Sequence, residues 1–293
     1  MGTLPGTTID ELGLSSLERV ELMVALEDTF GTHLDERAFA EVRAVGQLRE
    51  LVEGAAARGA PPAEPMDFPA WNRSWPARAV GRIGLSVLVL PLARAFAWIR
   101  VEGLEHLAAI EGPVIFASNH QSNMDTPVIM AALSPQWRYR LAPAMAKDFF
   151  DAHFFPAAHG RLAWFTNSLT YYLAALVFNA FPLPRREAGA RQALCYMGEL
   201  LEDGFSVLIF PEGHQTETGE IDRFRPGIGM IGSRLDVPVV PVRLEGVDRV
   251  LHRGWHMARP GHVRVAFGPP IRLTGDDYEA LAKQVEGAVR ALP

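Results

Sequence analysis

Short apolar runs that end in turn-forming residues predict buried strands in this chain. One run covers 113–118 after a glycine, a second covers 205–210 before a proline, and 141–145 has the same character. Runs of about four to eight apolar residues with such borders are typical of strands buried on both faces. Near the C-terminus, apolar residues at helical spacing predict an amphipathic helix over 276–292.

The pattern at the N-terminus is helical, and its helices are short. Between residues 9 and 53, apolar side chains recur at helical spacing while acidic side chains cover the opposite face. The apolar positions are Leu17, Val20, Val24 and Phe30, and the acidic ones are Glu18, Glu21, Glu27 and Asp28. Further short helices are expected at 34–36 and 48–52.

A proline-rich segment follows this region and divides the chain into three parts. Residues 54–78 contain five prolines, a composition that predicts an extended and semi-rigid linker. We therefore expect a helical module over 1–53, a linker over 54–78 and the main domain over 79–293. Trp71 and Trp75 with Arg73 and Arg78 in the linker suit a membrane interface, or they pack onto the main domain.

Two apolar stretches suggest contact with a membrane. Residues 79–100 are almost all apolar between Arg82 and Arg94, but Pro91 interrupts a run that is too short to span a bilayer. We expect an interfacial helix with basic flanks, with a buried core helix as the alternative. Residues 161–183 are rich in aromatic side chains, which could line a tunnel for an acyl chain or dip into the leaflet.

Composition and charge fit one α/β domain with a small appendage. The 293 residues carry a formal net charge of -6, 48% are hydrophobic, and Cys195 is the single cysteine. Mild acidity without a basic stripe argues against nucleic acid as a partner. A single cysteine excludes an internal disulfide and fits a reducing compartment. Residues 1–30 have no apolar signal-peptide core, so no secretory signal is expected.

The residues after the first apolar run carry the candidate chemistry. His120 and Asp125 lie in a polar turn, and a Thr-Pro pair then favours the start of a helix. Such a turn can fold the carboxylate onto the imidazole, which leaves the other ring nitrogen able to take a proton. Ser118 or Ser122 could be the nucleophile, or a substrate hydroxyl could be, with His120 as its general base. A histidine that only caps the helix is the structural alternative.

Three motifs in this order resemble those of a known enzyme family. Asn119-His120-x4-Asp125 follows the first strand, Phe-Pro-Glu-Gly follows the second at 210–213, and 237–242 reads Val-Pro-Val-Val-Pro-Val. Over about residues 80–275 the chain resembles the glycerolipid acyltransferases, the lysophosphatidic-acid-acyltransferase-like enzymes. The resemblance implies an α/β fold with a mixed central sheet flanked by helices. It also identifies 263–271 as the family's last strand and the turn after it.

The same resemblance implies roles for individual residues. His120 and Asp125 correspond to the catalytic pair, and Glu212, in a tight turn between proline and glycine, would hold the glycerol acceptor near His120. The substrate-binding residues that it implies are Asn119, Ser122, Arg185, Glu212, Gly213 and Arg225. Arg185 ends the family's short second motif, and the guanidinium of an arginine suits a phosphate.

The third motif departs from the family after its glycine. The family commonly has threonine or serine and then an arginine that contacts the acceptor's phosphate, whereas this chain has His214-Gln215. Phe224-Arg225 replaces the family's phenylalanine-lysine pair, so Arg225 is the candidate for that phosphate contact. This departure concerns the identity of the acceptor more than the type of reaction.

Residues 9–22 resemble an acyl carrier protein around the serine that bears its prosthetic group. The family's Asp-Ser-Leu falls on Ser15-Ser16-Leu17, which makes Ser16 the candidate for 4′-phosphopantetheine. A serine at a helix N-terminus offers an exposed hydroxyl, and the helix dipole favours a phosphodiester there. Because only eight residues precede the motif, we expect a partial all-α carrier module. In the alternative, Ser16 is an ordinary helix N-cap.

Together these features predict an O-acyltransferase on the cytoplasmic face of the cell membrane. His120 would deprotonate the free hydroxyl of a lysophospholipid such as 1-acyl-glycerol-3-phosphate, which attacks an acyl thioester, and N–H donors at the following helix start would hold the oxyanion. The donor is an acyl carrier protein, including the fused module, or acyl-CoA. The reaction implies no metal and no nucleotide cofactor. The glycines at 227–232 superficially resemble a dinucleotide-binding motif, but they fall in a presumed helix and no acidic residue on a following strand completes that motif.

Three alternatives stay open. One is re-acylation of a lysophospholipid such as lysophosphatidylethanolamine within a ligase–carrier–acyltransferase fusion. Another is a thioesterase-like hydrolase that uses the same His–Asp pair on water. The third is a non-catalytic module that binds lipid or docks a carrier.

Overall fold

A computed structural model describes most of the main domain and part of the N-terminal region. The described residues are 22–23, 26, 29–30, 32, 34, 38–39, 42, 44–57, 68–183, 190–216, 218–252, 254–255 and 257–293. The chain divides into two compact units, Met1–Asp67 with Arg186–Gly198, and Phe68–Arg185 with Glu199–Pro293. Ser16 and Arg185 lie outside the described residues.

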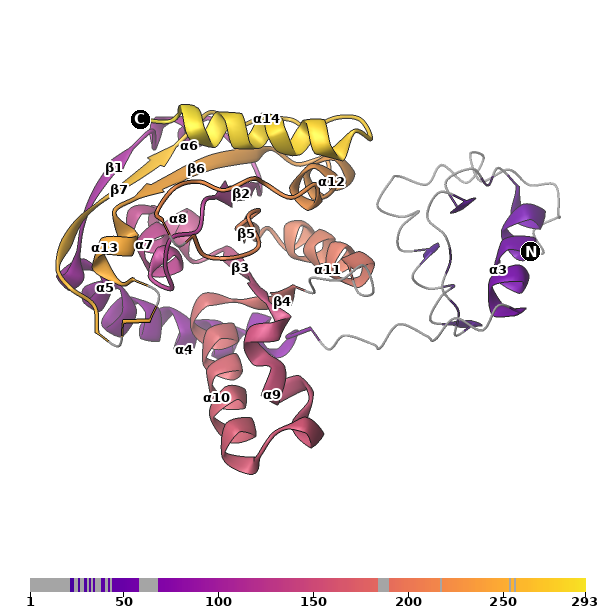
Figure 1. The fold of residues 1–293 in the computed structure, drawn as a ribbon, viewed down its shortest axis with the longest axis horizontal. Coiled ribbons are helices and arrows are strands. Elements are labelled where there is room, and N and C mark those ends of the chain that lie inside the picture. The colour runs from indigo at the N-terminus through magenta and orange to yellow at the C-terminus, as the bar shows by residue number, and fades with distance from the viewer. Residues whose placement is uncertain are drawn as a thin grey trace. The chain divides into compact units, whose positions relative to one another are not determined.

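A seven-stranded mixed sheet forms the centre of the larger unit (Figure 1). Its order is β1-β7-β6-β2-β5-β3-β4, and every neighbouring pair is parallel except β6 with β7. The strands are β1 (Ala97–Glu102), β2 (Ile115–Ser118), β3 (Leu141–Ala146), β4 (Phe181–Leu183), β5 (Ser206–Ile209), β6 (Val239–Glu245) and β7 (Gly261–Phe267). This arrangement confirms the mixed central sheet that the sequence predicts.

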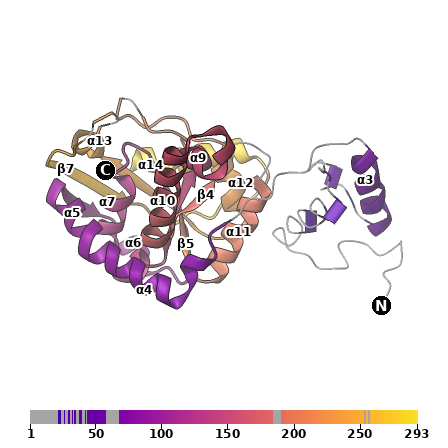
Figure 2. The same ribbon diagram turned by 90° about the horizontal axis from the view of Figure 1, so that it is seen from below.

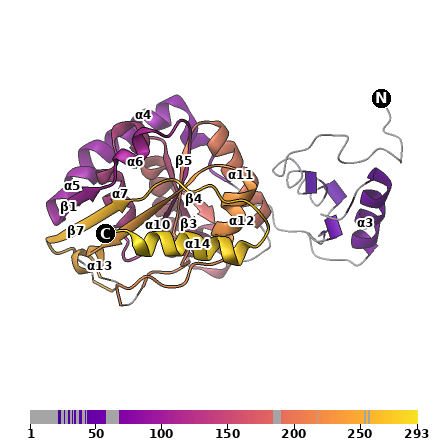
Figure 3. The same cartoon turned by 90° about the horizontal axis from the view of Figure 1, so that it is seen from above.

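Helices cover both faces of this sheet. Helices α5 and α7 pack against β1, while α12 and α14 lie together on the other side, seen from above in Figure 3. The helical elements are α3 (Val45–Ala57), η2 (Trp71–Arg73), α4 (Trp75–Gly84), the π-helix η3 (Leu85–Val89), α5 (Leu90–Phe96), α6 (Glu105–Ala108), α7 (Asp125–Ala132), α8 (Pro135–Arg138), η4 (Lys147–Phe150), α9 (Asp151–Phe154), η5 (Pro156–Ala158), α10 (Arg161–Phe178), α11 (Ala190–Glu202), α12 (Gly227–Arg234), α13 (Val247–Val250) and α14 (Tyr278–Ala291).

The apolar runs form the core, as their length and borders predict. Phe116 of β2 lies beside Leu208 of β5 and Val240 of β6, and all three side chains are fully buried. Because β2, β3 and β5 are parallel neighbours in this part of the sheet, their C-terminal ends meet at one edge, which we call the carboxyl edge. Loops at such an edge hold the functional sites of open α/β sheets.

Two of the three glycines at 227–232, Gly229 and Gly232, serve close packing, whereas a Cβ on Gly227 would meet nothing within 4 Å. A Cβ on Gly229 would lie 2.4 Å from the carbonyl oxygen of Tyr278, and one on Gly232 would lie 2.7 Å from a methyl carbon of Leu273. Because these two positions lack a side chain, α12 can pack closely against α14 and against the segment that precedes α14.

Two boundaries that the sequence predicts are wrong. Residues 97–100, expected to continue the apolar helix, belong to β1, because six consecutive pairings with β7 fix them as a strand. The predicted linker is helical at both ends, in α3 and from η2 into α4. Of its aromatic side chains, Trp71 packs on Tyr172 with ring centroids 5.9 Å apart, whereas Trp75 is exposed.

The smaller unit has its own apolar cluster. Met23, Leu34, Phe39, Val52 and Ala55 are buried there, and Leu48 and Leu51 of α3 pack on them. The predicted helix at 48–52 is therefore confirmed. Phe30, predicted for the apolar face, is instead 56% exposed. Leu17, Val20 and Val24 lie outside the described residues.

Candidate active site

The turn between β2 and α7 brings His120 and Asp125 together, as their spacing predicts. His120 donates a hydrogen bond from Nδ1 to Oδ2 of Asp125 over 2.7 Å. The carboxylate can only accept this bond, so the proton lies on Nδ1 and the lone pair on Nε2. The His120 side chain is 21% exposed, while that of Asp125 is fully buried. This is the geometry of a histidine prepared to accept a proton at Nε2.

Asp125 also organises the backbone of the turn. The same Oδ2 accepts hydrogen bonds from the backbone N–H groups of Gln121 (2.6 Å) and Ser122 (3.0 Å). Burial raises the pKa of Asp125, while the bonds from His120 and the two N–H groups oppose that rise. Its other oxygen, Oδ1, is buried without a hydrogen-bond partner in the described part of the chain.

Glu212 reaches the same turn from the carboxyl end of β5. Its Oε1 accepts the backbone N–H of His120 over 3.1 Å, and the residue is 1% exposed. Burial raises the pKa of Glu212 to about 7. Its Oε2 is buried and has no hydrogen-bond partner among the described residues. The carboxyl group can therefore be neutral or charged near physiological pH, with one oxygen uncommitted.

Phe210 and Thr216 fix the position of His120 from the segment that carries Glu212. The ring of Phe210 stacks on the imidazole, with centroids 4.2 Å apart and planes inclined by 21°. The backbone N–H of Thr216 donates to the carbonyl oxygen of His120 over 2.9 Å. The two motifs are thus joined by the ring contact and by main-chain bonds, which restricts movement of the imidazole.

Asn119, Gln121 and Ser122 tie the turn to the sheet and to the residues after β6. The Asn119 amide both donates to and accepts from the backbone of Leu244, over 3.0 and 2.7 Å. Ser122 donates from its hydroxyl to the carbonyl oxygen of Leu251 over 2.6 Å. All three side chains are buried. They hold the turn in this structure, and the predicted substrate contact of Asn119 and Ser122 stays a prediction.

Gln121 has a positioning role that its place in the sequence does not predict. Its amide donates to the carbonyl oxygen of Gly219 over 2.9 Å and accepts the backbone N–H of Val247 over 3.1 Å. The residue occupies a variable position of the His-x4-Asp motif, where glutamine carries no distinguishing signal. Only the fold brings its two partners to the turn, since Gly219 lies 98 residues and Val247 lies 126 residues after Gln121 in the sequence.

Arg225 lies against the Glu212 turn, and its predicted contact with the acceptor's phosphate stays a prediction. Its Nε donates to the carbonyl oxygen of Glu212 over 3.2 Å, and its guanidinium makes no ion pair within the described part of the chain. A Cβ on Gly213 would come within 2.7 Å of this Nε, and Gly213 has a φ of 75°. The glycine is therefore needed both for the backbone turn and for the approach of Arg225.

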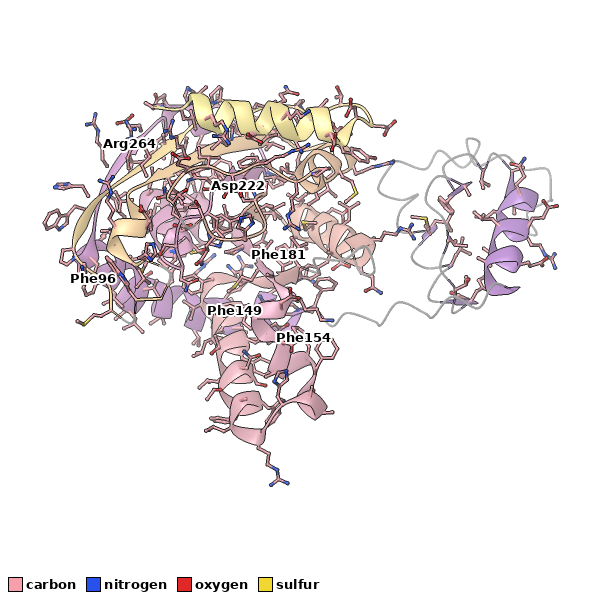
Figure 4. All side chains as sticks on the ribbon, in the orientation of Figure 1. Phe96, Phe149, Phe154, Phe181, Asp222 and Arg264 are labelled. Atoms are coloured by element: carbon pink, nitrogen blue, oxygen red, sulfur yellow. The ribbon has the colours of Figure 1, made fainter. Side chains whose placement is uncertain are left out.

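His214 and Gln215 are committed to contacts within this region. His214 contacts Asp222 through Nε2 over 3.1 Å, and Gln215 donates to the side chain of Asn123 over 2.5 Å. Asp222 is one of the side chains labelled in Figure 4. The two residues that replace the family's threonine and arginine thus close the loop over the turn, and Arg225 is left as the cation beside Glu212.

Comparison with known proteins matches both parts of the chain. Residues 98–245, about half of the chain, match the family model described as Acyltransferase. The chain belongs to the acyltransferase family. Residues 3–52 match the model described as Phosphopantetheine attachment site. The matched acyltransferase region contains the His120 turn, the Glu212 turn and Arg225.

The relatives of this acyltransferase include several 1-acyl-sn-glycerol-3-phosphate acyltransferases. The chloroplastic enzyme of Arabidopsis thaliana is 26% identical over 213 residues, 72% of this chain and 52% of the relative. That of Pseudomonas aeruginosa is 27% identical over 194 residues, 66% of this chain and 67% of the relative. The match spans about half the length of the chloroplastic relatives. A crystal structure of the 1-acyl-sn-glycerophosphate acyltransferase of Thermotoga maritima matches with a TM-score of 0.49 and 19% identity, over 97% of this chain and 95% of that chain.

The raised pKa of Glu212 predicts a pH-dependent stability of this acyltransferase. The pKa of the Glu212 carboxyl is about 7 in the folded chain and 4.5 in the unfolded chain, so the folded chain holds this proton more tightly. The contribution of the protonated carboxyl to the free energy of unfolding is therefore fully present below pH 4.5. It is lost as the pH rises to about 7, by roughly 3 kcal/mol in the free energy of unfolding. Urea unfolding of wild type and Glu212→Gln at pH 5 to 8 measures this difference. Equal pH slopes for the two proteins would refute it, and Glu279→Gln at an exposed site is the matched control.

Proposed function

We propose that this protein transfers a fatty acyl group from a thioester to the free hydroxyl of a lysophospholipid, with 1-acyl-glycerol-3-phosphate as the expected acceptor. The observation that carries the proposal is the His120–Asp125 bond beside the buried Glu212. Similarity to 1-acyl-sn-glycerol-3-phosphate acyltransferases supports the acceptor class.

His120 acts as the general base of the transfer. Its Nε2 takes the proton of the acceptor hydroxyl while that oxygen attacks the thioester carbonyl, and the buried carboxylate of Asp125 stabilises the imidazolium. As the tetrahedral intermediate collapses, the new C–O bond remains, the C–S bond breaks, and His120 returns the proton to the leaving sulfur. Ser118 and Ser122 donate their hydroxyl hydrogens to carbonyl oxygens, which favours a substrate hydroxyl as the nucleophile.

Glu212 and Arg225 hold the acceptor in this proposal. Oε1 of Glu212 is held by the backbone N–H of His120, and Oε2 has no hydrogen-bond partner among the described residues. In this proposal Oε2 binds a glycerol hydroxyl of the acceptor close to His120. The exposed Arg225 guanidinium beside it offers charge-assisted hydrogen bonds to the acceptor's phosphate. Arg185 is the further candidate for phosphate, and it lies outside the described residues.

The donor is a carrier-bound acyl thioester in this proposal, with acyl-CoA as the second candidate. The support is the phosphopantetheine attachment match over residues 3–52, which includes Ser16. We propose Ser16 as the attachment residue for 4′-phosphopantetheine. When bound, this group supplies the thiol that carries the acyl chain. Ser16 lies outside the described residues, so its fit rests on the sequence motif.

A membrane surface is the proposed location, because the acceptor resides in a bilayer. The sequence predicts a run that is too short to span a bilayer, but the helix begins earlier than that run. Within the described part of the chain, Trp75–Phe96 is long and apolar enough to cross a membrane, by length and composition only. Gly81, Leu85, Leu90 and Ala93 face the protein, while Trp75, Val80, Ile83, Val87, Leu88 and Leu92 are exposed. A helix that packs along one side and exposes apolar side chains on the other suits the interface of the cytoplasmic leaflet.

Product analysis with defined substrates tests the reaction. Purified protein, lysolipid in vesicles and either acyl-carrier or acyl-CoA should yield phospholipid and one free thiol per acyl group transferred. Thiol release at the same rate without lysolipid would instead identify a thioesterase. No turnover with either donor and any lysolipid would favour a module that only binds lipid or carrier.

Intact mass tests the carrier assignment separately. Co-expression with a phosphopantetheinyl transferase should add one phosphopantetheine to the wild-type chain and none to Ser16→Ala. If the mass is unchanged in both proteins, the attachment proposal is wrong, and the donor must be a separate carrier or CoA. The His120 chemistry is unaffected by that result.

A further inference from the structure

A helical hairpin leaves the sheet directly after β3. It consists of η4, α9, η5 and α10 (residues 147–178), and it projects from the rest of the larger unit (Figures 1 and 2). Since β3 ends at the carboxyl edge together with β2 and β5, the hairpin rises from the same edge as the turns of His120 and Glu212.

Internal contacts hold the hairpin in one shape. The backbone N–H of His153 donates to the Asn167 side chain over 3.0 Å, and that side chain donates to the carbonyl oxygen of Phe149 over 3.0 Å. The imidazole of His153 bonds the Ser168 hydroxyl over 2.8 Å and stacks on Tyr171 with centroids 4.4 Å apart. Figure 4 labels Phe149 and Phe154 on this element.

The hairpin exposes many large apolar side chains, most of them on α10. Leu162 is 77% exposed and Phe165 58%. Further exposed large side chains are Phe149, Phe155, Trp164, Leu169, Tyr172 and Leu173. Four consecutive apolar residues, 162–165, point around the whole circumference of α10 because each is rotated by about 100° from the last. A helix that is apolar all round is normally buried in protein or in lipid.

Charge distinguishes this surface from an ordinary solvated one. Between Ala152 and Pro184 the sequence contains Arg161 as the single charged residue and no acidic one. Arg161 begins α10 at the turn from α9, and Lys147, at the other end of the hairpin, lies over the rings of Phe154 and Phe155. The hairpin's two acidic residues, Asp148 and Asp151, precede this stretch, and Asp151 is paired with His159 over 2.8 Å. Aromatic side chains with scattered cations and few acids are complementary to the interface of an anionic membrane.

We propose that the hairpin inserts into the lipid leaflet and faces the active site toward the membrane. The exposed first half of α10, nine residues long, would measure about 13 Å, which suits the headgroup and upper acyl region. The second half packs on α4, where a Cβ on Gly81 would lie 2.1 Å from the carbonyl oxygen of Leu176. The hairpin is thereby joined to the apolar helix Trp75–Phe96, and the inference does not depend on the identity of the acyl acceptor.

A fluorescent label at the hairpin tests insertion directly. In a Cys195→Ser background, Leu162→Cys carries an environment-sensitive dye, and Glu279→Cys on the distant α14 carries the same dye as the control. With phosphatidylethanolamine–phosphatidylglycerol vesicles, the dye at 162 should shift to the blue and be quenched by lipids brominated in their acyl chains. The dye at 279 should show neither change. An unquenched dye at 162 on vesicle-bound protein, or no binding to vesicles at all, overturns the proposal.

Paired charge substitutions test the contribution of the hairpin to binding without a label. Leu162→Asp with Phe165→Asp should lower the vesicle partition coefficient roughly tenfold or more, because two side chains lose their burial in lipid. Gln284→Asp with Gly287→Asp adds the same charge at the same spacing on exposed sites of α14 and should change partition less than twofold. Equal effects of the two pairs would contradict insertion. So would a lipid-free dimer that Leu162→Asp with Phe165→Asp dissociates, since the hairpin would then bind a second chain.

Discussion

Replacing His120 by alanine is expected to lower kcat for acyl transfer by roughly 10²- to 10⁴-fold, because a positioned general base supplies about that factor. The thermal stability should change little, since the imidazole is partly exposed and the backbone bonds of His120 to Glu212 and Thr216 remain. The measurement is the rate of phospholipid formation from saturating acyl thioester and lysolipid, with thiol release followed in parallel.

Controls separate this loss from a general loss of structure. KM for the lysolipid should remain within a few-fold of the wild-type value, because the acceptor contacts proposed for Glu212 and Arg225 are intact. Lys283→Ala, at an exposed position of α14, is a matched control that should keep full activity. If His120→Ala keeps more than a tenth of the wild-type kcat in a clean preparation, His120 is not the base.

Much of this site is predictable from sequence because its main chemistry is local. The six-residue span from His120 to Asp125 follows an apolar run and precedes a helix, so the carboxylate returns to the imidazole through the turn alone. Glu212 is equally constrained, by a proline and a glycine at the end of a strand. Placing the two motifs side by side requires only that their strands are neighbours, as β2 and β5 are.

Other parts of the site depend on the fold and could not be predicted. Gln121 acts through Gly219 and Val247, and the stacking of Phe210 on His120 depends on the register between β2 and β5. Residues 97–100 continue an apolar run, and pairing with β7 rather than any local preference makes them a strand. The N-terminal helices show the same limit, because periodicity alone placed Phe30 on a face that is in fact exposed.

The apolar stretch 161–183 shows why hydropathy cannot identify the partner of a surface. Its composition suits a core helix, an acyl tunnel or a membrane contact, and the three differ only in what covers the side chains. In the fold, Tyr171, Ala174 and Ala175 are buried, while Leu162 and Phe165 are exposed. The same helix therefore packs on protein along one side of its second half, while Leu162 and Phe165 in its first half are uncovered.

Two substitutions of Asp125 should separate its part in the reaction from its part in folding. Asp125→Asn is expected to lower kcat by roughly 10²- to 10⁴-fold, because a neutral amide no longer stabilises the imidazolium. One amide oxygen at the position of Oδ2 can still accept from His120, Gln121 and Ser122, so the turn should keep its shape. The measurement is kcat together with the melting temperature of the variant.

Asp125→Ala removes the acceptor as well as the charge. The backbone N–H groups of Gln121 and Ser122 would then be buried without a partner, at a cost of about 2–5 kcal/mol in the free energy of unfolding. Because His120 and Asp125 act as one unit, Asp125→Asn combined with His120→Ala should be little slower than His120→Ala alone. A fully active Asp125→Asn would show that the carboxylate only shapes the turn. Multiplicative losses in the double variant would show that the two side chains act independently, contrary to the hydrogen bond that joins them.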